Sequence, residues 1–276
     1  MNKMPLDHPP KLRRWPNLMD TLMEDGSDGF SYLAQCDALA IDAGNSRIKA
    51  GWFSGQHLIE VWHIPVPEFG AGALPALPNR TVVCSVSYPE EQLKNWLIQR
   101  GLSSIHVIRK EDPLPFKTQY STPETLGSDR KMLVHGANVL RPGIPRLVVS
   151  LGTCITYDWI GPDQVHLGGY ISPGLPMRWS SMHQYTGRLP LVSPPDLDAG
   201  ANIPAKNTES ALQWGVVEGV RHEIRGFWRS FLHQNDPSSQ AQLILTGGDA
   251  HFFEISPEER IFAAPNLALI GLHAML

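Results

Sequence analysis

The chain is poor in the features that mark several common functional classes. Its 276 residues include three cysteines, Cys36, Cys84 and Cys154, which stand far apart and outside any Cys-x-x-Cys spacing. Such spacing disfavours both a disulfide framework and a structural zinc site. No apolar run reaches the roughly 18 residues of a membrane span, and the N-terminus lacks the apolar core of a signal peptide. We therefore expect a cytoplasmic protein without membrane contact.

Missing motifs and a balanced charge narrow the chemistry further. The 23 basic and 27 acidic residues nearly cancel, and no dense basic run could follow a nucleic-acid backbone. The eleven histidines form no His-Glu-x-x-His pair, and neither a Gly-x-Ser-x-Gly elbow nor a Walker motif is present. These absences disfavour a nucleic-acid binder, a zinc or serine hydrolase and a P-loop kinase. A small-molecule partner remains the expectation.

The chain divides into an appended segment and two halves. Residues 1–37 contain the proline pair Pro9-Pro10 and the glycine-rich stretch Asp25–Gly29, with only weak apolar periodicity between them. From Ala38 the pattern becomes strand, turn, strand and then β-α-β, so we expect a first domain over residues 38–145. A second strand-turn-strand opens at Arg146, which predicts a second domain over residues 146–276.

The two halves begin with the same pattern. Gly44 in the first turn lies 108 residues before Gly152 in the second. Aligning these glycines places Ile41–Asn45 over Val149–Thr153, as a duplication would. The sequence thus predicts an α/β fold of two duplicated domains with a nucleotide cleft between them.

A long helix is predicted in the second half. It should begin at about Thr208 with Asn207 as its N-cap. Ala211, Gly215 and Gly219 would allow another element to pack closely beside it. Its apolar stripe consists of Leu212, Val216, Val220, Ile224, Phe227 and Phe231.

The first turn has the parts that phosphoryl transfer needs. A kinase must hold a metal-bound nucleotide and supply donors to the phosphate oxygens. Asp42 can hold magnesium through water, Gly44 leaves room for a phosphate, and Asn45 and Ser46 are small polar donors. Lys49 is near enough to add positive charge. The alternative is a hairpin turn with no ligand, because such residues also make good turns.

Two further turns in the second half fit the same chemistry. Gly152 and Thr153, with Thr156 after them, could contact the phosphates from the other side. Gly247 and Gly248 follow an apolar strand and would suit a contact with adenosine. Each of these is also an ordinary surface turn when taken alone.

Asp129 is the candidate catalytic base. A carboxylate in the first turn of a helix stays ionised and can accept a hydroxyl proton. The neighbouring Arg130 could pair with an anionic substrate. The alternative is an ordinary acid of a first helical turn with its salt bridge.

Taken together and in order, these segments resemble the type III pantothenate kinases. The resemblance rests on Asp42–Ser46, Leu126–Arg130, Gly152-Thr153 and Gly168–Leu175. It continues through Thr186–Pro190, Asn207-Thr208 and Thr246–Gly248. It therefore covers the chain from about residue 38 to the C-terminus, and the combination is specific although each piece is not.

The resemblance implies a fold, a reaction and residue roles. The fold would be actin-like (ribonuclease H-like), and the activity would be phosphorylation of pantothenate by ATP with magnesium, the first step of coenzyme A biosynthesis. A homodimer is implied, in which the partner chain helps to enclose pantothenate. Asp42 to Lys49 would form the phosphate loop, Thr153 a second ATP contact, and Asp129 the proton acceptor. The implied pantothenate contacts are Tyr120, Gly127, Ser128, Asp129, Arg130 and Thr186.

The chain departs from the family pattern at two places. Ser150 stands where the family usually has an aspartate that coordinates a monovalent cation, potassium or ammonium, and a neutral hydroxyl is a weaker ligand. Activity would then be independent of such a cation, served by another ligand such as Asp158, or reduced. The second departure is the segment 1–37, because family members usually begin almost directly at the first strand.

Two other functions stay open at this point. One is a nucleotide-binding accessory or regulatory protein that keeps the fold but has weakened catalysis, which Ser150 would permit. Asp129, Arg130 and Tyr120 argue against it, because a pure binder needs no base beside an anion site. The other is a kinase of a different small alcohol, such as a sugar, against which Tyr120 and Thr186 argue.

Overall fold

The computed structural model describes residues 12–14, 31–45, 47–66, 74, 77–86, 88–197, 204–235, 240–253 and 260–276. Ser46 and most of the expected N-terminal segment lie outside these residues. The chain divides into two compact units. Unit 1 comprises residues 1–115, 124–140 and 268–276, and unit 2 comprises residues 116–123 and 141–267. Compared with the expected linear domains, residues 116–123 join the second unit and the C-terminal residues 268–276 join the first.

Unit 1 is built on a six-stranded sheet with the strand order β1-β4-β3-β2-β5-β6. Its strands are β1 (Leu12–Arg14), β2 (Ala38–Ala43), β3 (Arg47–Ser54), β4 (His57–Pro65), β5 (Arg80–Ser85) and β6 (Ile105–Ile108). The three strands β2, β3 and β4 form an antiparallel meander. β5 then pairs with β2 in parallel, and β6 pairs with β5 in parallel.

Unit 2 repeats this topology in a five-stranded sheet with the order β11-β10-β7-β8-β9. Its strands are β7 (Arg146–Leu151), β8 (Cys154–Ile160), β9 (His166–Pro173), β10 (Gln242–Thr246) and β11 (Ile261–Ala263). β7, β8 and β9 are antiparallel, while β10 and β11 are added in parallel on the other side of β7. Apart from β1, strand order and direction therefore match unit 1, which confirms the predicted α/β fold of two duplicated halves.

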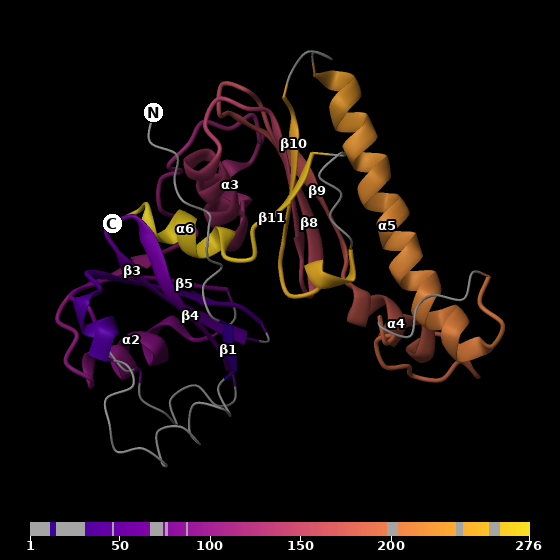
Figure 1. Cartoon of the computed structure of the whole chain (residues 1–276), viewed down its shortest axis with the longest axis horizontal. Coiled ribbons are helices and arrows are strands. Elements are labelled where there is room, and N and C mark those ends of the chain that lie inside the picture. The colour runs from indigo at the N-terminus through magenta and orange to yellow at the C-terminus, as the bar shows by residue number, and fades with distance from the viewer. Residues whose placement is uncertain are drawn as a thin grey trace. The chain divides into compact units, whose positions relative to one another are not determined.

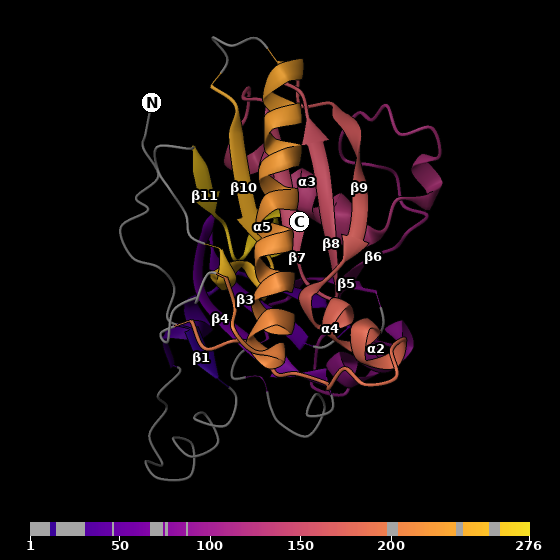
Figure 2. The ribbon, with the colours of Figure 1, turned by 90° about the vertical axis from the view of Figure 1, so that its right-hand side faces the viewer.

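Helices cover the sheets within each unit. The α-helices are α2 (Glu90–Ile98), α3 (Ser128–Leu140), α4 (Leu175–Gln184), α5 (Thr208–Gln234) and α6 (Leu267–His273), with short 3-10 turns η1 (Ser31–Gln35), η3 (Pro123–Thr125) and η4 (Ala250–Phe252). Figure 2 shows α5 running along one face of the unit 2 sheet. The first turns of α5 lie beside α4 (Figure 1), where the Trp179 indole donates to the Leu212 carbonyl at 3.1 Å.

The alternation of side chains along β2 separates two cores in unit 1. Leu39 and Ile41 point to one face, where they join a buried cluster with Leu93 and Leu97 of α2. The intervening alanines point to the other face, where the cluster includes Met132 of α3 together with two leucines of α6. The first sheet is therefore covered on both faces, and α3 is fixed over the end of β2 that leads into the first turn.

The stripe of α5 forms the core of unit 2. Val216, Val220, Ile224 and Phe231 are buried in a cluster with residues of the sheet, and Phe227 is partly buried at its edge. Leu212 is buried outside that cluster. The predicted cap is confirmed, because the Asn207 side chain accepts a hydrogen bond from the Ser210 amide at 2.8 Å. The expected close packing beside Gly215 and Gly219 is wrong within the described residues: both are exposed, and a Cβ at either would meet nothing within 4 Å.

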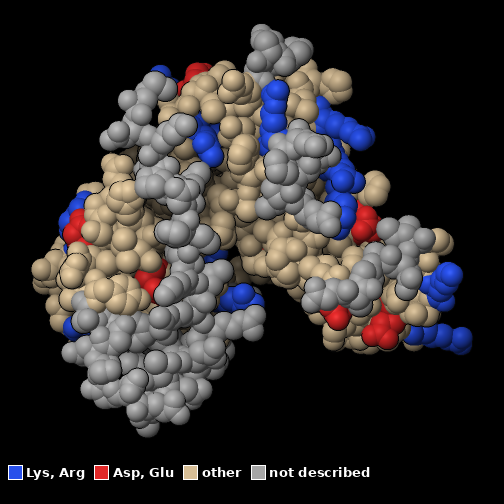
Figure 3. Space-filling view, in the orientation of Figure 1, with Lys and Arg blue, Asp and Glu red and all other residues tan. Residues whose placement is uncertain are grey.

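Basic side chains gather over α5 on the face shown in Figure 3. Arg221, Arg225 and Arg229 recur at intervals of four residues on this helix. Arg221 is used within unit 2, since it meets Glu218 at 3.6 Å and donates to the Phe252 carbonyl at 3.3 Å. In the described part of the chain, no helix combines the length and the apolar character needed to span a membrane.

Candidate active site

A carboxylate and an ammonium group face each other at the first turn. Asp42, near the end of β2, pairs across the sheet with Lys49 of β3, and the Gly44 amide closes the turn by donating to the Arg47 carbonyl at 3.0 Å. Burial raises the pKa of Asp42 to about 6, although Lys49 acts in the opposite direction. Burial likewise lowers the pKa of Lys49. The turn therefore holds a poorly solvated pair of charges that a polar ligand would stabilise.

Asp129 lies within electrostatic reach of this turn. Its negative charge is one of the causes that raise the pKa of Asp42, and both residues belong to unit 1. The Asp129 carboxylate is packed against Gly127, where a Cβ would stand 2.5 Å from Asp129 Oδ1. The structure thus brings the predicted base and the predicted phosphate loop together within one unit, and only glycine fits at position 127 without moving the carboxylate.

Buried polar contacts fix the start of α3, which carries Asp129. The Ser128 side chain is hydrogen-bonded to Cys84, the residue that pairs with Asp42 between β5 and β2. Burial raises the pKa of the Cys84 thiol to about 12, so the thiol stays neutral. Next to the base, the buried Lys131 Nζ donates to the carbonyl of Asp112 at 3.1 Å, and also to that of Lys110. These contacts hold the helix N-terminus in place from two sides.

The residues expected to contact pantothenate fall into two groups. Gly127, Ser128 and Arg130 lie with Asp129 at the start of α3, although only 4% of the Arg130 surface is exposed. Tyr120 and Thr186 belong to unit 2. The exposed Thr186 hydroxyl donates to the Met182 carbonyl at 2.7 Å and accepts from the Leu189 amide at 3.3 Å, so it also holds the turn after α4.

The second turn is held by contacts with the β9–α4 junction. The Gly152 amide donates to the Cys154 carbonyl at 3.1 Å, and the Gly174 amide donates to the Thr153 carbonyl at 3.0 Å. A Cβ at Gly174 would overlap the carbonyl oxygens of Gly152 and Thr153. The Thr153 side chain itself is exposed. A glycine therefore lets two backbones meet and leaves the threonine hydroxyl facing solvent.

The turn after β10 lies against the same end of the sheet. Gly247 has a φ of 97°, and a Cβ there would overlap the backbone of Leu151. The Asp249 amide donates to the Leu151 carbonyl at 3.1 Å. A Cβ at the exposed Gly248, by contrast, would meet nothing within 4 Å. The structure thus brings the predicted ATP contacts Thr153, Gly247 and Gly248 to one end of the unit 2 sheet.

Ser150 lies in the middle of this sheet, between two threonines. It pairs with Thr246 of β10 and with Thr156 of β8. Asp158, which the sequence offered as another cation ligand, directs one carboxylate oxygen to His166 at 2.9 Å and is fully buried. Within the described residues, no three His, Cys, Asp or Glu side chains are grouped as metal ligands.

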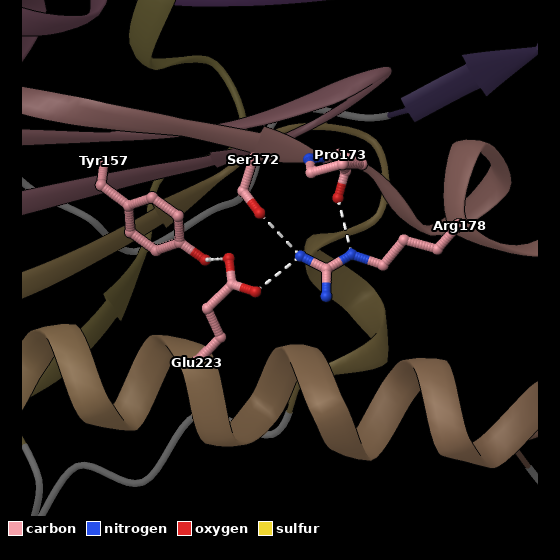
Figure 4. A network of polar contacts seen from close by, with 5 residues as sticks. All are labelled: Tyr157, Ser172, Pro173, Arg178 and Glu223. Atoms are coloured by element: carbon pink, nitrogen blue, oxygen red, sulfur yellow. Dashed lines mark hydrogen bonds and ion pairs between the residues drawn. The ribbon is translucent and has the colours of Figure 1, made fainter. Parts of the chain in front are cut away.

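Figure 4 shows a polar network beneath the β9–α4 junction that no sequence pattern predicted. Glu223 of α5 accepts hydrogen bonds from the Tyr157 hydroxyl at 2.8 Å and from Arg178 at 2.6 Å. Arg178 also donates to Ser172 Oγ and to the Pro173 carbonyl, each at 2.8 Å. Burial raises the pKa of Tyr157. Burial also acts to raise the pKa of Glu223, but the hydrogen bonds that Glu223 accepts outweigh this effect and lower the pKa of Glu223. Because Tyr157 and Glu223 are 66 residues apart, no local spacing could have revealed the network.

Comparison with known proteins decides the family. The family model described as type III pantothenate kinase matches residues 38–230. The chain belongs to the type III pantothenate kinase family. The match begins at the first residue of β2 and ends within α5, so it includes all of the turns described above except the one after β10.

Two relatives bear this membership out over nearly their whole length. The protein named type III pantothenate kinase in Flavobacterium johnsoniae is 37% identical over 237 residues, which cover 85% of this chain and 95% of the relative. The protein of the same name in Christiangramia forsetii is 35% identical over 246 residues, with coverage of 86% and 97%. Neither alignment depends on a short shared motif.

A solved structure agrees with the fold. A crystal structure from Campylobacter jejuni, whose protein carries the name of the Baf family of transcriptional activators, superposes with a TM-score of 0.53 at 23% identity. The superposition covers 86% of this chain and 96% of the other. At this identity the likeness concerns the fold alone. The regulatory name therefore says nothing about the activity of the pantothenate kinase family member described here.

Proposed function

We propose that the protein transfers the γ-phosphoryl group of ATP to the primary hydroxyl of pantothenate, which yields 4′-phosphopantothenate and ADP. This is the first step of coenzyme A biosynthesis. The observation that carries the proposal is the juxtaposition of Asp129 and Asp42 within unit 1, in a chain that belongs to this family. A base beside a phosphate-type loop is what phosphoryl transfer to an alcohol requires.

Asp129 is proposed to accept the proton of the attacking hydroxyl. As the new oxygen–phosphorus bond forms, the bond from the γ-phosphorus to the β–γ bridging oxygen breaks and ADP leaves. Asp129 lies in the first turn of α3, at the helix end that carries partial positive charge. Contact with Gly127 restricts where that carboxylate can lie, which keeps the base near one reacting oxygen.

The nucleotide would be held by the predicted turns. Asp42 would hold magnesium through water, while Gly44, Asn45 and Lys49 contact the phosphates. The raised pKa of Asp42 fits this role, since a poorly solvated carboxylate gains from a nearby cation. Magnesium, when bound with ATP, would neutralise charge on the transferred phosphoryl group.

The remaining ATP contacts would come from the exposed Thr153 hydroxyl and from the turn at Gly247 and Gly248. Gly248 is exposed, and a Cβ there would meet nothing within 4 Å, so its backbone is open to a ligand. Ser46, the remaining residue of the predicted phosphate loop, lies outside the described residues.

Pantothenate would be bound at the start of α3. Arg130, which is 4% exposed, would pair with its carboxylate. Gly127 and Ser128 would contribute short-range contacts beside the base. Tyr120 and Thr186 are the further contacts that the family resemblance implies.

We also infer a homodimer and a cytoplasmic location, both from the family resemblance. The monovalent cation is a separate matter, because Ser150 offers one neutral oxygen where the family usually has a carboxylate. We propose a weak or absent response to potassium. The catalytically weakened accessory protein and the kinase of another alcohol are the alternatives that the experiment must separate.

The test is product identification with the purified full chain. Mass spectrometry would follow pantothenate, glucose and glycerol separately, each with ATP and magnesium and with or without potassium. The proposal predicts a phosphorylated product from pantothenate alone, with ADP formed in equal amount. A phosphorylated sugar or glycerol would contradict the assigned substrate. ATP binding without any product would favour the accessory protein.

A further inference from the structure

A buried polar chain in unit 2 ends at the segment that carries Tyr120. Asp158 and His166 are both 0% exposed, and Asp158 Oδ1 lies 2.9 Å from His166 Nε2. The other ring nitrogen, Nδ1, lies 2.9 Å from Thr118 Oγ1. The Thr118 oxygen in turn accepts a hydrogen bond from the Tyr120 amide at 3.0 Å. Four groups are thus linked from the interior of the sheet to a partly exposed tyrosine.

The hydrogen positions of this chain are interdependent. A carboxylate accepts hydrogen bonds, so Asp158 requires a proton on His166 Nε2. In the neutral imidazole, Nδ1 is then the acceptor and the Thr118 hydroxyl donates to it. This leaves the lone pairs of Thr118 Oγ1 for the Tyr120 amide. The carboxylate therefore selects the tautomer that orients the hydroxyl under Tyr120.

Backbone and ring contacts reinforce the link. The His166 amide donates to the Lys117 carbonyl at 2.9 Å, and the Gln119 amide donates to the His166 carbonyl at 2.8 Å. The Tyr120 ring stacks toward His166, with centroids 6.0 Å apart and planes inclined by 27°. Phe116 approaches His166 edge-on, also at 6.0 Å. These contacts explain why residues 116–123 belong to unit 2 although the next residues along the chain belong to unit 1.

We propose that Asp158, His166 and Thr118 are positioning residues that hold Tyr120 ready to bind pantothenate. The inference rests on the proposed function, in which Tyr120 is a substrate contact. Stability alone is a poor reason for these buried polar residues, because replacing a buried charged pair by apolar residues of similar volume often leaves the stability of a protein unchanged or raises it. A hydroxyl with two partners does what an apolar side chain cannot: it links the Tyr120 backbone to the same His166 ring toward which the Tyr120 ring stacks.

The test compares Thr118→Val, which keeps the shape and removes both hydrogen bonds, with Thr118→Ser, which restores the hydroxyl. Ser121→Ala, at an exposed position of the same segment, is the control. Loss of these bonds should raise the KM for pantothenate roughly three- to tenfold in Thr118→Val, with the KM for ATP unchanged. Thr118→Ser and Ser121→Ala should stay within about twofold of the wild type. An unchanged KM for pantothenate in Thr118→Val would overturn the inference.

Amide hydrogen exchange separates this inference from the proposed function, because it needs no turnover. The Tyr120 amide should exchange faster in Thr118→Val than in the wild type and return to the wild-type rate in Thr118→Ser. Equal exchange in all three proteins would also overturn the inference. If the wild type forms no phosphopantothenate, the proposed function fails. The assignment of Asp158, His166 and Thr118 to pantothenate binding then fails with it. The exchange result then still decides whether Thr118 positions Tyr120.

Discussion

The two first turns of the duplicated halves share a scaffold and differ in charge. In unit 1 the turn between β2 and β3 carries Asp42 opposite Lys49, with Asp129 nearby. In unit 2 the equivalent strand end carries Ser150 opposite Thr156, and the exposed side chain of the turn is Thr153. The same topology therefore supports a charged turn in one half and a neutral turn of hydroxyls and backbone amides in the other.

The turns also differ in length and in what packs on them. Four residues separate the last strand pair, Ala43 and Ile48, in unit 1, whereas three separate Leu151 and Ile155 in unit 2. The shorter turn is held by Gly174 from the β9–α4 junction. We propose a division of labour: unit 1 carries the base and the charged phosphate loop, and unit 2 adds neutral contacts to the nucleotide through small residues.

The largest effect is expected from removing the proposed base, Asp129, in unit 1. Asp129→Asn should lower kcat by roughly 10²- to 10⁴-fold, because general-base assistance is lost. The affinity for ATP, measured by calorimetric titration, should change little. Glu124→Gln, which neutralises an exposed acid of η3 five residues earlier, is the matched control and should keep the wild-type rate. A kcat for Asp129→Asn within twofold of wild type would show that another group takes the proton.

In unit 2, a single added methyl group should lower the stability of the fold. Gly247→Ala meets the Leu151 backbone and has a φ of 97°, so unfolding should be easier by about 3 kcal/mol. Its neighbour provides the control, since Gly248→Ala finds open space and should stay within about 0.5 kcal/mol. Urea titrations of both variants measure the difference. Equal stabilities would mean that Gly247 is not required for the close approach of β10 to β7.

The network under the β9–α4 junction predicts a pH dependence of stability. Glu223→Gln should lower the free energy of unfolding by about 1.5 kcal/mol at pH 7, because two hydrogen bonds to a carboxylate are weakened. The pKa of Glu223 is lowered on folding, so its contribution is full above the ordinary value of 4.5 and is lost as the pH falls through the folded-state pKa. The gap between wild type and variant should therefore narrow below about pH 4.5.

Denaturant titrations at a series of pH values measure this gap. Glu218→Gln, on the same helix, removes only a 3.6 Å ion pair and should show a smaller and flatter difference. A gap for Glu223→Gln that stays constant down to pH 3 would contradict the role assigned to its ionised form.

The smallest effect is expected from restoring the usual aspartate of the family at position 150 in unit 2. Ser150→Asp places a carboxylate between Thr246 and Thr156 and should create a rate increase with potassium of less than about tenfold. Sodium is the control cation, and the wild type should show little response to either. If Ser150→Asp responds to potassium no more than the wild type does, Ser150 does not mark the cation position.

Local patterns predicted the parts of the fold that local forces determine. The apolar runs before Gly44 and Gly152 become β2 and β7, and the Asn207 cap starts α5, because strand patterning and capping depend on a few neighbouring residues. Asp129 falls in the first turn of α3 for the same reason. Its proximity to Asp42 followed only from the family resemblance, since nothing in the spacing brings residues 87 positions apart together.

Features that depend on distant contacts were not predicted. The edge strand β9 escaped notice because Gly168 and Gly169 interrupt its alternation and Ile171 is exposed. The hydrogen bonds that link Asp158 to Tyr120 join three separate segments of the sequence. Their ring and hydroxyl groups leave no periodic signal in the sequence. The prediction of close packing beside Gly215 and Gly219 was wrong for a related reason. Spacing shows which face of α5 these glycines occupy, but not whether another element packs on that face.

The most direct test of the division between the halves is a paired measurement on Asp129→Asn and Thr153→Val. Calorimetric titration with a non-hydrolysable ATP analogue gives nucleotide affinity, and pantothenate-dependent ADP release gives turnover for the same samples. We expect Asp129→Asn to bind the analogue like the wild type with little turnover, and Thr153→Val to bind it more weakly while retaining kcat at saturating ATP. Loss of nucleotide affinity in Asp129→Asn, together with unchanged affinity in Thr153→Val, would contradict the assignment of the base to Asp129 in unit 1 and of a neutral nucleotide contact to Thr153 in unit 2.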